Sequence, residues 1–284
     1  MLVFVLVLAL LVIAVGAGFL GSLVGLGGGI ILTPVLVLFF GIPFGDAVGA
    51  STVSVLATST TAGATFVHSR LTDLRIGNFL QIATVPGALI GATATVLLAH
   101  TSLVPVLLIA LGVVLLSPLL GGLALHDEEH PSQAPGDSIS QRLHLEGSYH
   151  GQVRRRVVRY RAQNSTGALE VMFGAGIVAG LFGIGSGVLN VLALDRVLRL
   201  PIKVATATSN FMIGVTATAG VGVLFVGGLV LPMLAAPVAV GTTAGAYFGS
   251  RMLPSLTNRL LRVVFLVVLL FLSVETIVRG AVGL

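Results

Sequence analysis

"GSLVGLGGGIILTP" covers Gly21–Pro34 and places five glycines inside an otherwise apolar segment. Each glycine in a helix interior costs about 1 kcal/mol relative to alanine. A similar stretch follows 158 residues later, where "AGIVAGLFGIGSG" (Ala175–Gly187) aligns with "AGFLGSLVGLGGG" (Ala17–Gly29). The sequence therefore predicts two helices that break at equivalent places in two related halves.

The similarity between the halves continues beyond the glycines. Without a gap, the same offset aligns five further pairs: Pro43 with Pro201, Ala47 with Ala205, Ser51 with Ser209, Thr58 with Thr216, and Thr60 with Thr218. After a four-residue shift, Pro86–Ala92 is expected to align with the segment around Gly241 and Gly245. This pattern predicts an internal duplication, which is common in membrane transporters.

The composition indicates a multi-pass membrane protein. Hydrophobic residues make up 56% of the 284 positions, charged residues only 9%, and the mean hydropathy is +1.09. Soluble domains carry about 25% charged residues. Several apolar stretches are long enough to cross a hydrocarbon core of about 30 Å, so the lipid bilayer is the expected surrounding. The N-terminus lacks the basic segment and cleavage site of a signal peptide and is interpreted as a retained apolar segment.

We expect an all-α membrane protein with three parts. These are a first transmembrane repeat (1–125), a polar loop (126–166) and a second transmembrane repeat (167–284). Each repeat contains four apolar pieces, in the ranges 1–40, 46–67, 77–99 and 103–125, and then 168–198, 204–226, 230–250 and 259–280. The segment Ile30–Phe40 after the first break would extend only about 16 Å as a helix, half a bilayer. Each repeat is therefore predicted to contain a Gly-broken, re-entrant-type hairpin plus about three transmembrane helices.

The distribution of basic residues suggests how the repeats are oriented. Arginines and Lys203 are concentrated in four connecting regions, at 68–75, 126–166, 195–203 and 251–262. These regions lie on one side of the membrane only if the broken segments return to the side from which they entered. The pattern predicts inverted repeats in the cell (plasma) membrane, with loop 126–166 on the cytoplasmic side. It also explains the net charge of +5 without nucleic-acid binding.

The two breaks are the candidate binding site. A turn inside the bilayer leaves backbone groups that lipid cannot satisfy, and it directs free N–H groups and a positive helix end toward any cavity beside it. The residues expected to bind a small anion lie at or just beyond a break: Gly27, Gly28, Gly29, Ser51, Thr52, Gly185, Ser186, Gly187, Ser209 and Asn210. The alternative is that the glycines and hydroxyls serve only close helix packing, as expected at Gly87–Gly91 and Gly241–Gly245.

Other chemistry finds little support in the sequence. "GLGGGI" lacks the preceding strand and the downstream acid of a dinucleotide fingerprint. "HDEEH" (His126–His130) matches a zinc-protease pattern, but it lies in the polar loop and is interpreted as a solvated charge run. No obvious proton-relay carboxylate lies deep in a predicted span. No catalytic residue, metal ligand or cofactor is expected, and an integral-membrane enzyme is the least favoured class.

The stretches Gly21–Val55 and Gly180–Ile213 resemble the two halves of the TauE/SafE family, also called the sulfite exporter or TSUP family. The resemblance covers nearly the whole chain apart from loop 126–166. It implies a carrier of small sulfur-containing anions, namely sulfite, thiosulfate, or organosulfonates such as sulfoacetate. In that case Gly27–Gly29 and Gly185–Gly187 would hold the anion, and rocking of the halves would give alternating access.

Two other functions remain open at this point: a passive anion channel, and a non-transporting membrane scaffold in which loop 126–166 is the functional part. The sequence leaves undecided whether transport is coupled to protons or sodium, and it does not indicate the oligomeric state.

Overall fold

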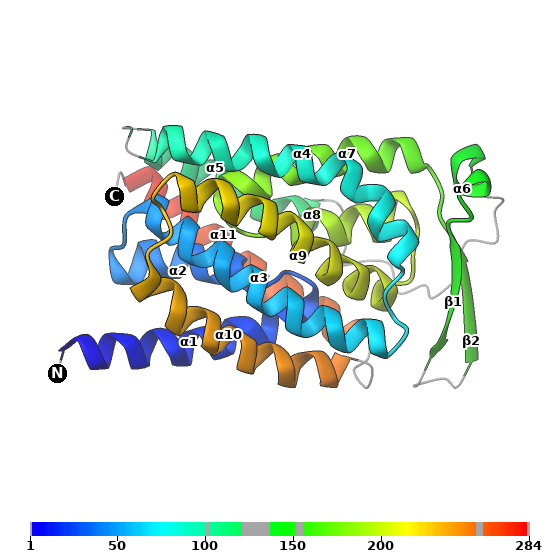
Figure 1. Ribbon diagram of the computed structural model, residues 1–284, viewed down its shortest axis with the longest axis horizontal. Coiled ribbons are helices and arrows are strands. Elements are labelled where there is room, and N and C mark those ends of the chain that lie inside the picture. The colour runs from blue at the N-terminus through cyan, green and yellow to red at the C-terminus, as the bar shows by residue number, and fades with distance from the viewer. Residues whose placement is uncertain are drawn as a thin grey trace.

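The computed structural model describes residues 2–99, 101, 103–120, 137–151, 156–253 and 258–282. Most of its helices run along the long axis of the molecule (Figure 1). The first half contains α1 (Leu2–Val24), α2 (Gly29–Phe40), α3 (Phe44–His68), α4 (Leu74–Leu98) and α5 (Val104–Leu120). The second half contains α7 (Ser165–Phe182), α8 (Gly187–Leu192), the π-helix η1 (Ala193–Val197), α9 (Ile202–Val226), α10 (Pro232–Met252) and α11 (Asn258–Val282). The helical prediction for both repeats is therefore confirmed.

Both glycine-rich stretches interrupt a helix through left-handed backbone. Between α1 and α2, the φ angles of Gly25, Gly27 and Gly28 are 81°, 74° and 74°. Between α7 and α8, those of Gly183, Gly185 and Ser186 are 66°, 77° and 54°. Glycine adopts such angles without steric cost, whereas other L-residues rarely do. The glycines therefore permit two sharp turns that a continuous apolar helix could not make.

The two halves exchange their packing partners. Helix α1 packs along α10, and α7 packs along α4. A Cβ on Gly245 would lie 2.0 Å from the carbonyl oxygen of Val15, and a Cβ on Gly87 would lie 2.3 Å from that of Phe173. These two contacts are equivalent at the 158-residue offset, so the alignment continues through these helices without a gap. The four-residue shift predicted from the sequence is therefore wrong.

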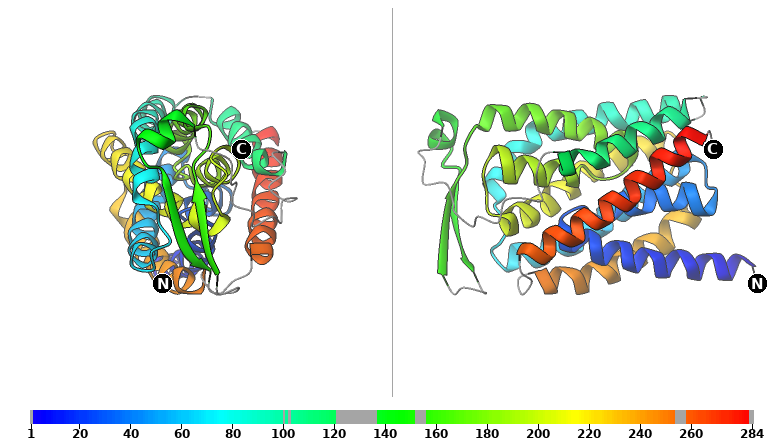
Figure 2. Two further views of the ribbon diagram at one scale, coloured as in Figure 1. Left: turned by 90° about the vertical axis from the view of Figure 1, so that its right-hand side faces the viewer. Right: turned by 180° about the vertical axis from the view of Figure 1, so that it is seen from behind.

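Helices α3 and α9 pack against each other in opposite directions. A Cβ on Gly214 would meet Ser59 Oγ at 2.7 Å, and a Cβ on Gly220 would meet Thr52 Cγ2 at 3.6 Å. Residues later in α9 therefore contact residues earlier in α3. Figure 1 shows the same antiparallel arrangement, and α5 packs against α11 on another side of the bundle (Figure 2).

The surface of the bundle is apolar and its interior is partly polar. Ile82, Leu97, Met233 and Val226 are 72–88% exposed, whereas many serines and threonines of α3 and α9 are buried. Three helices, α4, α7 and α9, are long and apolar enough to cross a membrane, with mean hydropathies of 1.6, 1.5 and 1.6 in the described residues. A surface of this kind is stable in lipid rather than in water. The chain is a helical membrane protein.

Part of the polar loop 126–166 has a fold of its own, which the sequence did not predict. Short helix α6 (Ser138–Arg142) precedes an antiparallel hairpin of β1 (Glu146–Gly151) and β2 (Arg156–Arg161). Tyr160 and Leu145 pack into the core beneath it. The alternation of arginines with Val158 and Tyr160 suits a strand with one buried face. The hairpin lies across one end of the helix bundle (Figures 1 and 2). His126–His130 lie outside the described residues.

Two aspartates attach this loop to the helix ends. Asp73 accepts hydrogen bonds from the N–H groups of Arg75 and Ile76 at the start of α4, and from the Tyr160 hydroxyl at 3.0 Å. Asp137 accepts from Ser140 N–H in α6 and from both the N–H and the hydroxyl of Ser165 in α7. Each carboxylate thus caps a helix and joins the polar segment to the membrane part of the chain.

We predict that Gly91→Ala destabilises the bundle. A Cβ there would lie 2.0 Å from the carbonyl oxygen of Ile177, so α4 and α7 would be forced apart. Gly222→Ala is the matched control, because no heavy atom lies within 4 Å of its added Cβ. Helix propensity favours alanine at both positions by about 1 kcal/mol. In a thermal-shift assay on detergent-purified protein, Gly91→Ala should lower Tm by several degrees and Gly222→Ala should leave it unchanged or raise it.

Asp73→Ala should lower the free energy of unfolding by about 1–2 kcal/mol, because it removes a helix cap together with the Tyr160 hydrogen bond. Tyr160→Phe removes only the hydrogen bond and should have the smaller effect. Chemical unfolding of both variants, with Ser69→Ala as a control on an exposed helix end, measures the difference. Equal effects of Asp73→Ala and Tyr160→Phe would contradict the capping role.

Candidate functional site

The two helix breaks lie against each other in the interior. A Cβ on Gly29 would be 2.6 Å from the carbonyl oxygen of Gly183, and a Cβ on Gly187 would be 2.5 Å from that of Gly25. These contacts are equivalent at the offset of the duplication. The glycines are therefore needed for close approach of two backbones as well as for the turns themselves.

Ser51 links the two breaks by hydrogen bonds, and Ser209 bonds to the first break. The Ser51 hydroxyl donates to the carbonyl oxygens of Gly29 (2.9 Å) and Gly183 (3.2 Å), one from each break. The Ser209 hydroxyl donates to the carbonyl oxygen of Gly25 at 2.9 Å. Both serines are fully buried. The structure thus brings the predicted serines to the predicted glycines, one from α3 and one from α9.

Thr52 and Asn210 follow these serines and bond to helix backbone. The Thr52 hydroxyl donates to the carbonyl oxygen of Val48 at 2.7 Å. The Asn210 amide nitrogen donates to the carbonyl oxygens of Ser22 (3.3 Å) and Thr206 (3.1 Å). The Ser59 hydroxyl donates to the backbone carbonyl oxygen of Asn210. Asn210 is therefore held from α1, α3 and its own helix.

These bonds determine the polarity that the four side chains can offer a ligand. A serine or threonine hydroxyl carries one proton, and an amide nitrogen carries two. The protons of Ser51, Thr52 and Ser209, and both protons of Asn210, are directed to carbonyl oxygens. Only lone pairs remain available in this conformation, and lone pairs do not stabilise an anion.

Hydrogen-bond donors are nevertheless present at the breaks. The N–H groups of Ile31 and Leu32 donate to the carbonyl oxygen of Gly28, whereas those of Gly29 and Ile30 belong to the first turn of α2, which has no intrahelical acceptors. Gly27 N–H donates to the carbonyl oxygen of Gly21 at 3.4 Å. The Ser186 hydroxyl is buried and has no hydrogen-bond partner among the described residues.

Two more buried polar groups near the breaks stand out in the structure. The Thr58 hydroxyl lies 3.4 Å from where a Cβ on Gly28 would be, and it has no partner in the described part of the chain. Both amide atoms of Asn190 are also buried without a hydrogen-bond partner among the described residues. Asn190 was missed in the sequence analysis. A comparison of the two halves could have identified it, because the polar Asn190 replaces the apolar Leu32 at the equivalent position of the first half.

Apolar side chains fill the space beside the breaks. Val55 and Ile213 are equivalent residues, and each lies within 3.1 Å of where a Cβ on Gly27 or Gly185 would be. Together with Ala217 they form a small buried cluster of their own. These two side chains therefore pack against the turns of both breaks.

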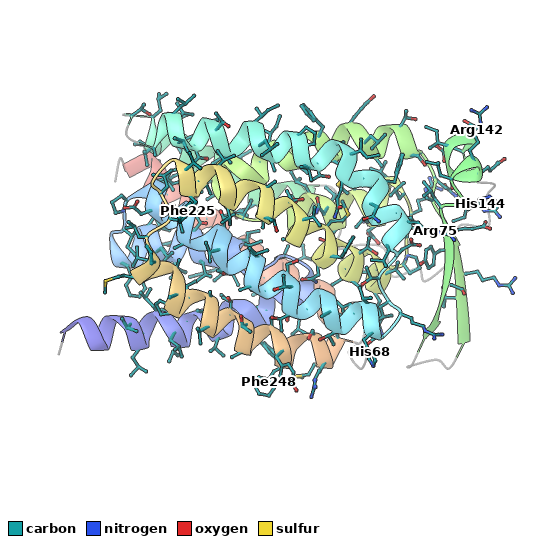
Figure 3. All side chains as sticks on the ribbon, viewed as in Figure 1. His68, Arg75, Arg142, His144, Phe225 and Phe248 are labelled. Atoms are coloured by element: carbon teal, nitrogen blue, oxygen red, sulfur yellow. The ribbon has the colours of Figure 1, made fainter. Side chains whose placement is uncertain are left out.

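Several arginine and histidine side chains lie at one end of the bundle. His68, Arg75, Arg142 and His144 are all found at the end that carries the β-hairpin, whereas Phe225 lies near the opposite end (Figure 3). Asp195 in η1, which the sequence analysis also passed over, lies 3.5 Å from the Arg196 guanidinium. Within the described residues, no group of three or more histidine, aspartate or glutamate side chains could hold a metal ion.

The comparisons with known proteins agree with this architecture. The family model "Sulfite exporter TauE/SafE" matches residues 10–276. "Probable membrane transporter protein YunE" of Bacillus subtilis (strain 168) is 27% identical over 278 residues, which cover 95% of this chain and 97% of that protein. No solved structure matches the chain. With a match that runs from α1 to α11 and includes both helix breaks, the chain belongs to the sulfite exporter TauE/SafE family of membrane transporters.

Proposed function

We propose that this transporter carries small sulfur-containing anions, such as sulfite, thiosulfate or sulfoacetate, across the plasma membrane by alternating access. The observation that carries the proposal is the meeting of two helix breaks whose contacts are equivalent under the duplication. The family name supports the class of solute. A neutral, dipole-lined site suits an anion that must enter a membrane interior and leave it again.

The two repeats are proposed to be inverted in the membrane, each with a re-entrant hairpin. The antiparallel packing of α3 and α9 supports this, because these are equivalent helices. A second support is the bond from Gln163 N–H to the carbonyl oxygen of Leu198 at 3.3 Å, which joins the start of α7 to the end of η1. The broken segment α7–α8–η1 thus begins and ends at the same end of the bundle.

The orientation follows from charge. Basic residues and the β-hairpin share one end of the molecule (Figure 3), and basic residues near membrane spans are retained on the cytoplasmic side. Loop 126–166, with its hairpin, is therefore proposed to be cytoplasmic. The exposed arginines of this end would also raise the local concentration of anions at that entrance.

The solute is proposed to bind at the N–H groups of Gly28, Gly29 and Gly187 and at the Ser186 hydroxyl. The positive end of α2 faces the first of these positions. Ser51, Thr52, Ser209 and Asn210, whose protons are directed to carbonyl oxygens, act as positioning residues that fix the shape of the breaks. Gly27 and Gly185 supply the turns and contact Val55 and Ile213.

Alternating access is proposed to arise from rocking of two units. One unit is α1 with α10 and the other is α7 with α4, since each broken hairpin packs along a helix of the other repeat. Ser51 touches both breaks, so the relative movement of the units would change its two hydrogen bonds. The apolar contact of Val55 and Ile213 would close the pathway between the two sides of the membrane in the intermediate state.

Ser51→Ala combined with Ser209→Ala should lower sulfite flux at least about tenfold, because the buried hydroxyls that bond to the carbonyl groups of the breaks are lost. Flux is measured in proteoliposomes loaded on one side, and correct insertion is checked by gel filtration and thermal shift. Thr60→Val is the matched control, since the exposed Thr60 hydroxyl bonds only to its own helix. Unchanged flux in a folded double variant would refute the proposed site.

Ser186→Gly should separate affinity from stability. Glycine relieves the left-handed backbone at φ 54°, which should stabilise the fold by about 1 kcal/mol. The same change removes the proposed hydroxyl donor, so KM for sulfite should rise several-fold while Tm rises slightly. The first break has Gly28 at the position equivalent to Ser186, so glycine is compatible with this backbone conformation. A raised Tm with unchanged KM would exclude Ser186 from solute contact.

A further inference from the structure

We propose that the first break also holds one sodium ion, bound by the Asn210 amide oxygen and the carbonyl oxygens at the end of α1. This inference rests on the proposed transport function and supplies its coupling ion. The Asn210 amide oxygen is a buried acceptor, and an acceptor has the wrong polarity to bind an anion.

The Asn210 amide can be oriented in only one way. Its nitrogen lies 3.3 Å from the carbonyl oxygen of Ser22 and 3.1 Å from that of Thr206. The reversed amide would place an oxygen against two oxygens, which is repulsive. The other atom is therefore Oδ1, which is buried and has no partner among the described residues. An amide oxygen only accepts, so it needs either a donor or a cation.

The surroundings of this oxygen favour a cation. Asn210 reaches the last turn of α1, which ends at Val24. In this turn the carbonyl oxygen of Gly21 accepts from three N–H groups and that of Ser22 accepts from Asn210. The carbonyl groups of Leu23 and Val24 remain at the negative end of the helix dipole. Ser209 already places one hydroxyl proton on the carbonyl oxygen of Gly25. The carbonyl oxygens of Leu23 and Val24, together with the buried Asn210 Oδ1, are the acceptors proposed to hold the cation.

The absence of carboxylates selects a monovalent ion. None of the described aspartates and glutamates belongs to a break or to the serine and asparagine positions facing it. Calcium and magnesium sites in proteins normally include carboxylates, whereas carbonyl, amide and hydroxyl oxygens suffice for sodium. A proton is not an alternative ligand, because an amide oxygen is not protonated at physiological pH.

The site occurs in one repeat only. At the position equivalent to Asn210, the first repeat has Thr52, whose hydroxyl donates to the carbonyl oxygen of Val48. The second break therefore lacks the amide oxygen. The C-terminal end of α1 and the N-terminal end of α2 meet at the same break, so a cation and an anion bound there would attract each other. Each should then raise the affinity for the other by the same factor.

The experiment compares sodium chloride with choline chloride at equal concentration on the full-length, detergent-purified chain. Tm of the wild type should rise with sodium concentration and saturate, which gives a dissociation constant. Asn210→Thr introduces the residue of the other repeat. It should raise the dissociation constant for sodium about tenfold, because one oxygen ligand is lost. Sulfite should strengthen sodium binding in the wild type.

Asn190→Leu is the matched control. It also removes a buried amide and introduces the residue of the other repeat, but it lies in α8 rather than beside the end of α1. It should leave the sodium titration unchanged. The proposal is overturned by equal wild-type Tm in sodium and choline, whether or not Asn210→Thr folds, and also by an Asn210→Thr variant that keeps the full sodium response.

Sulfite flux in proteoliposomes separates this inference from the proposed function. Flux that is equal in sodium and choline would refute the cation site and leave anion transport standing. A saturable sodium response without any sulfite flux would retain the cation site and contradict the proposed solute.

Discussion

The close approach of two left-handed helix breaks is the constraint on which the architecture depends. Gly29 and Gly183 come together without side chains between them, and Ser51 donates to the carbonyl oxygens of both. In a membrane interior, water cannot satisfy these carbonyl groups, so protein hydroxyls have to do so. The serines of α3 and α9 are therefore required by the breaks, and the breaks in turn bring the C-terminal ends of α1 and α7 together in the interior.

The same hydrogen bonds change how the polar interior is understood. A row of buried hydroxyls suggests a hydrophilic pathway, yet those of Ser51, Thr52 and Ser209 already donate to backbone. Groups without partners in the described residues are the more informative ones, because burying an unpaired polar atom costs about 1–3 kcal/mol. Ser186 and Asn190 belong to the second repeat, and the equivalent positions of the first carry Gly28 and Leu32. The two halves thus share equivalent contacts at the breaks, while the polar groups at equivalent positions differ.

The polar segment that carries the hairpin also has a structural role, because hydrogen bonds attach it to the membrane helices. Asp73 caps α4 and accepts from the Tyr160 hydroxyl of this segment. Asp137 caps α6 of this segment and accepts from the N–H group and the hydroxyl of Ser165 at the start of α7. Both carboxylates are attached to helices that belong to the α4–α7 unit. The hairpin is thus connected to one of the two units proposed to rock, and it would follow the movement of that unit.

The sequence by itself determined the membrane class, the family, the duplication and the places where the helices break, because glycine patterns and apolar runs are local properties. It could not give the packing exchange of α1 with α10 and α7 with α4, since these contacts join helices that are far apart in the chain. It also suggested donors at Ser51, Ser209 and Asn210. The tertiary structure directed those protons to carbonyl oxygens, because the direction of a hydrogen bond depends on partners up to 188 residues away in the chain.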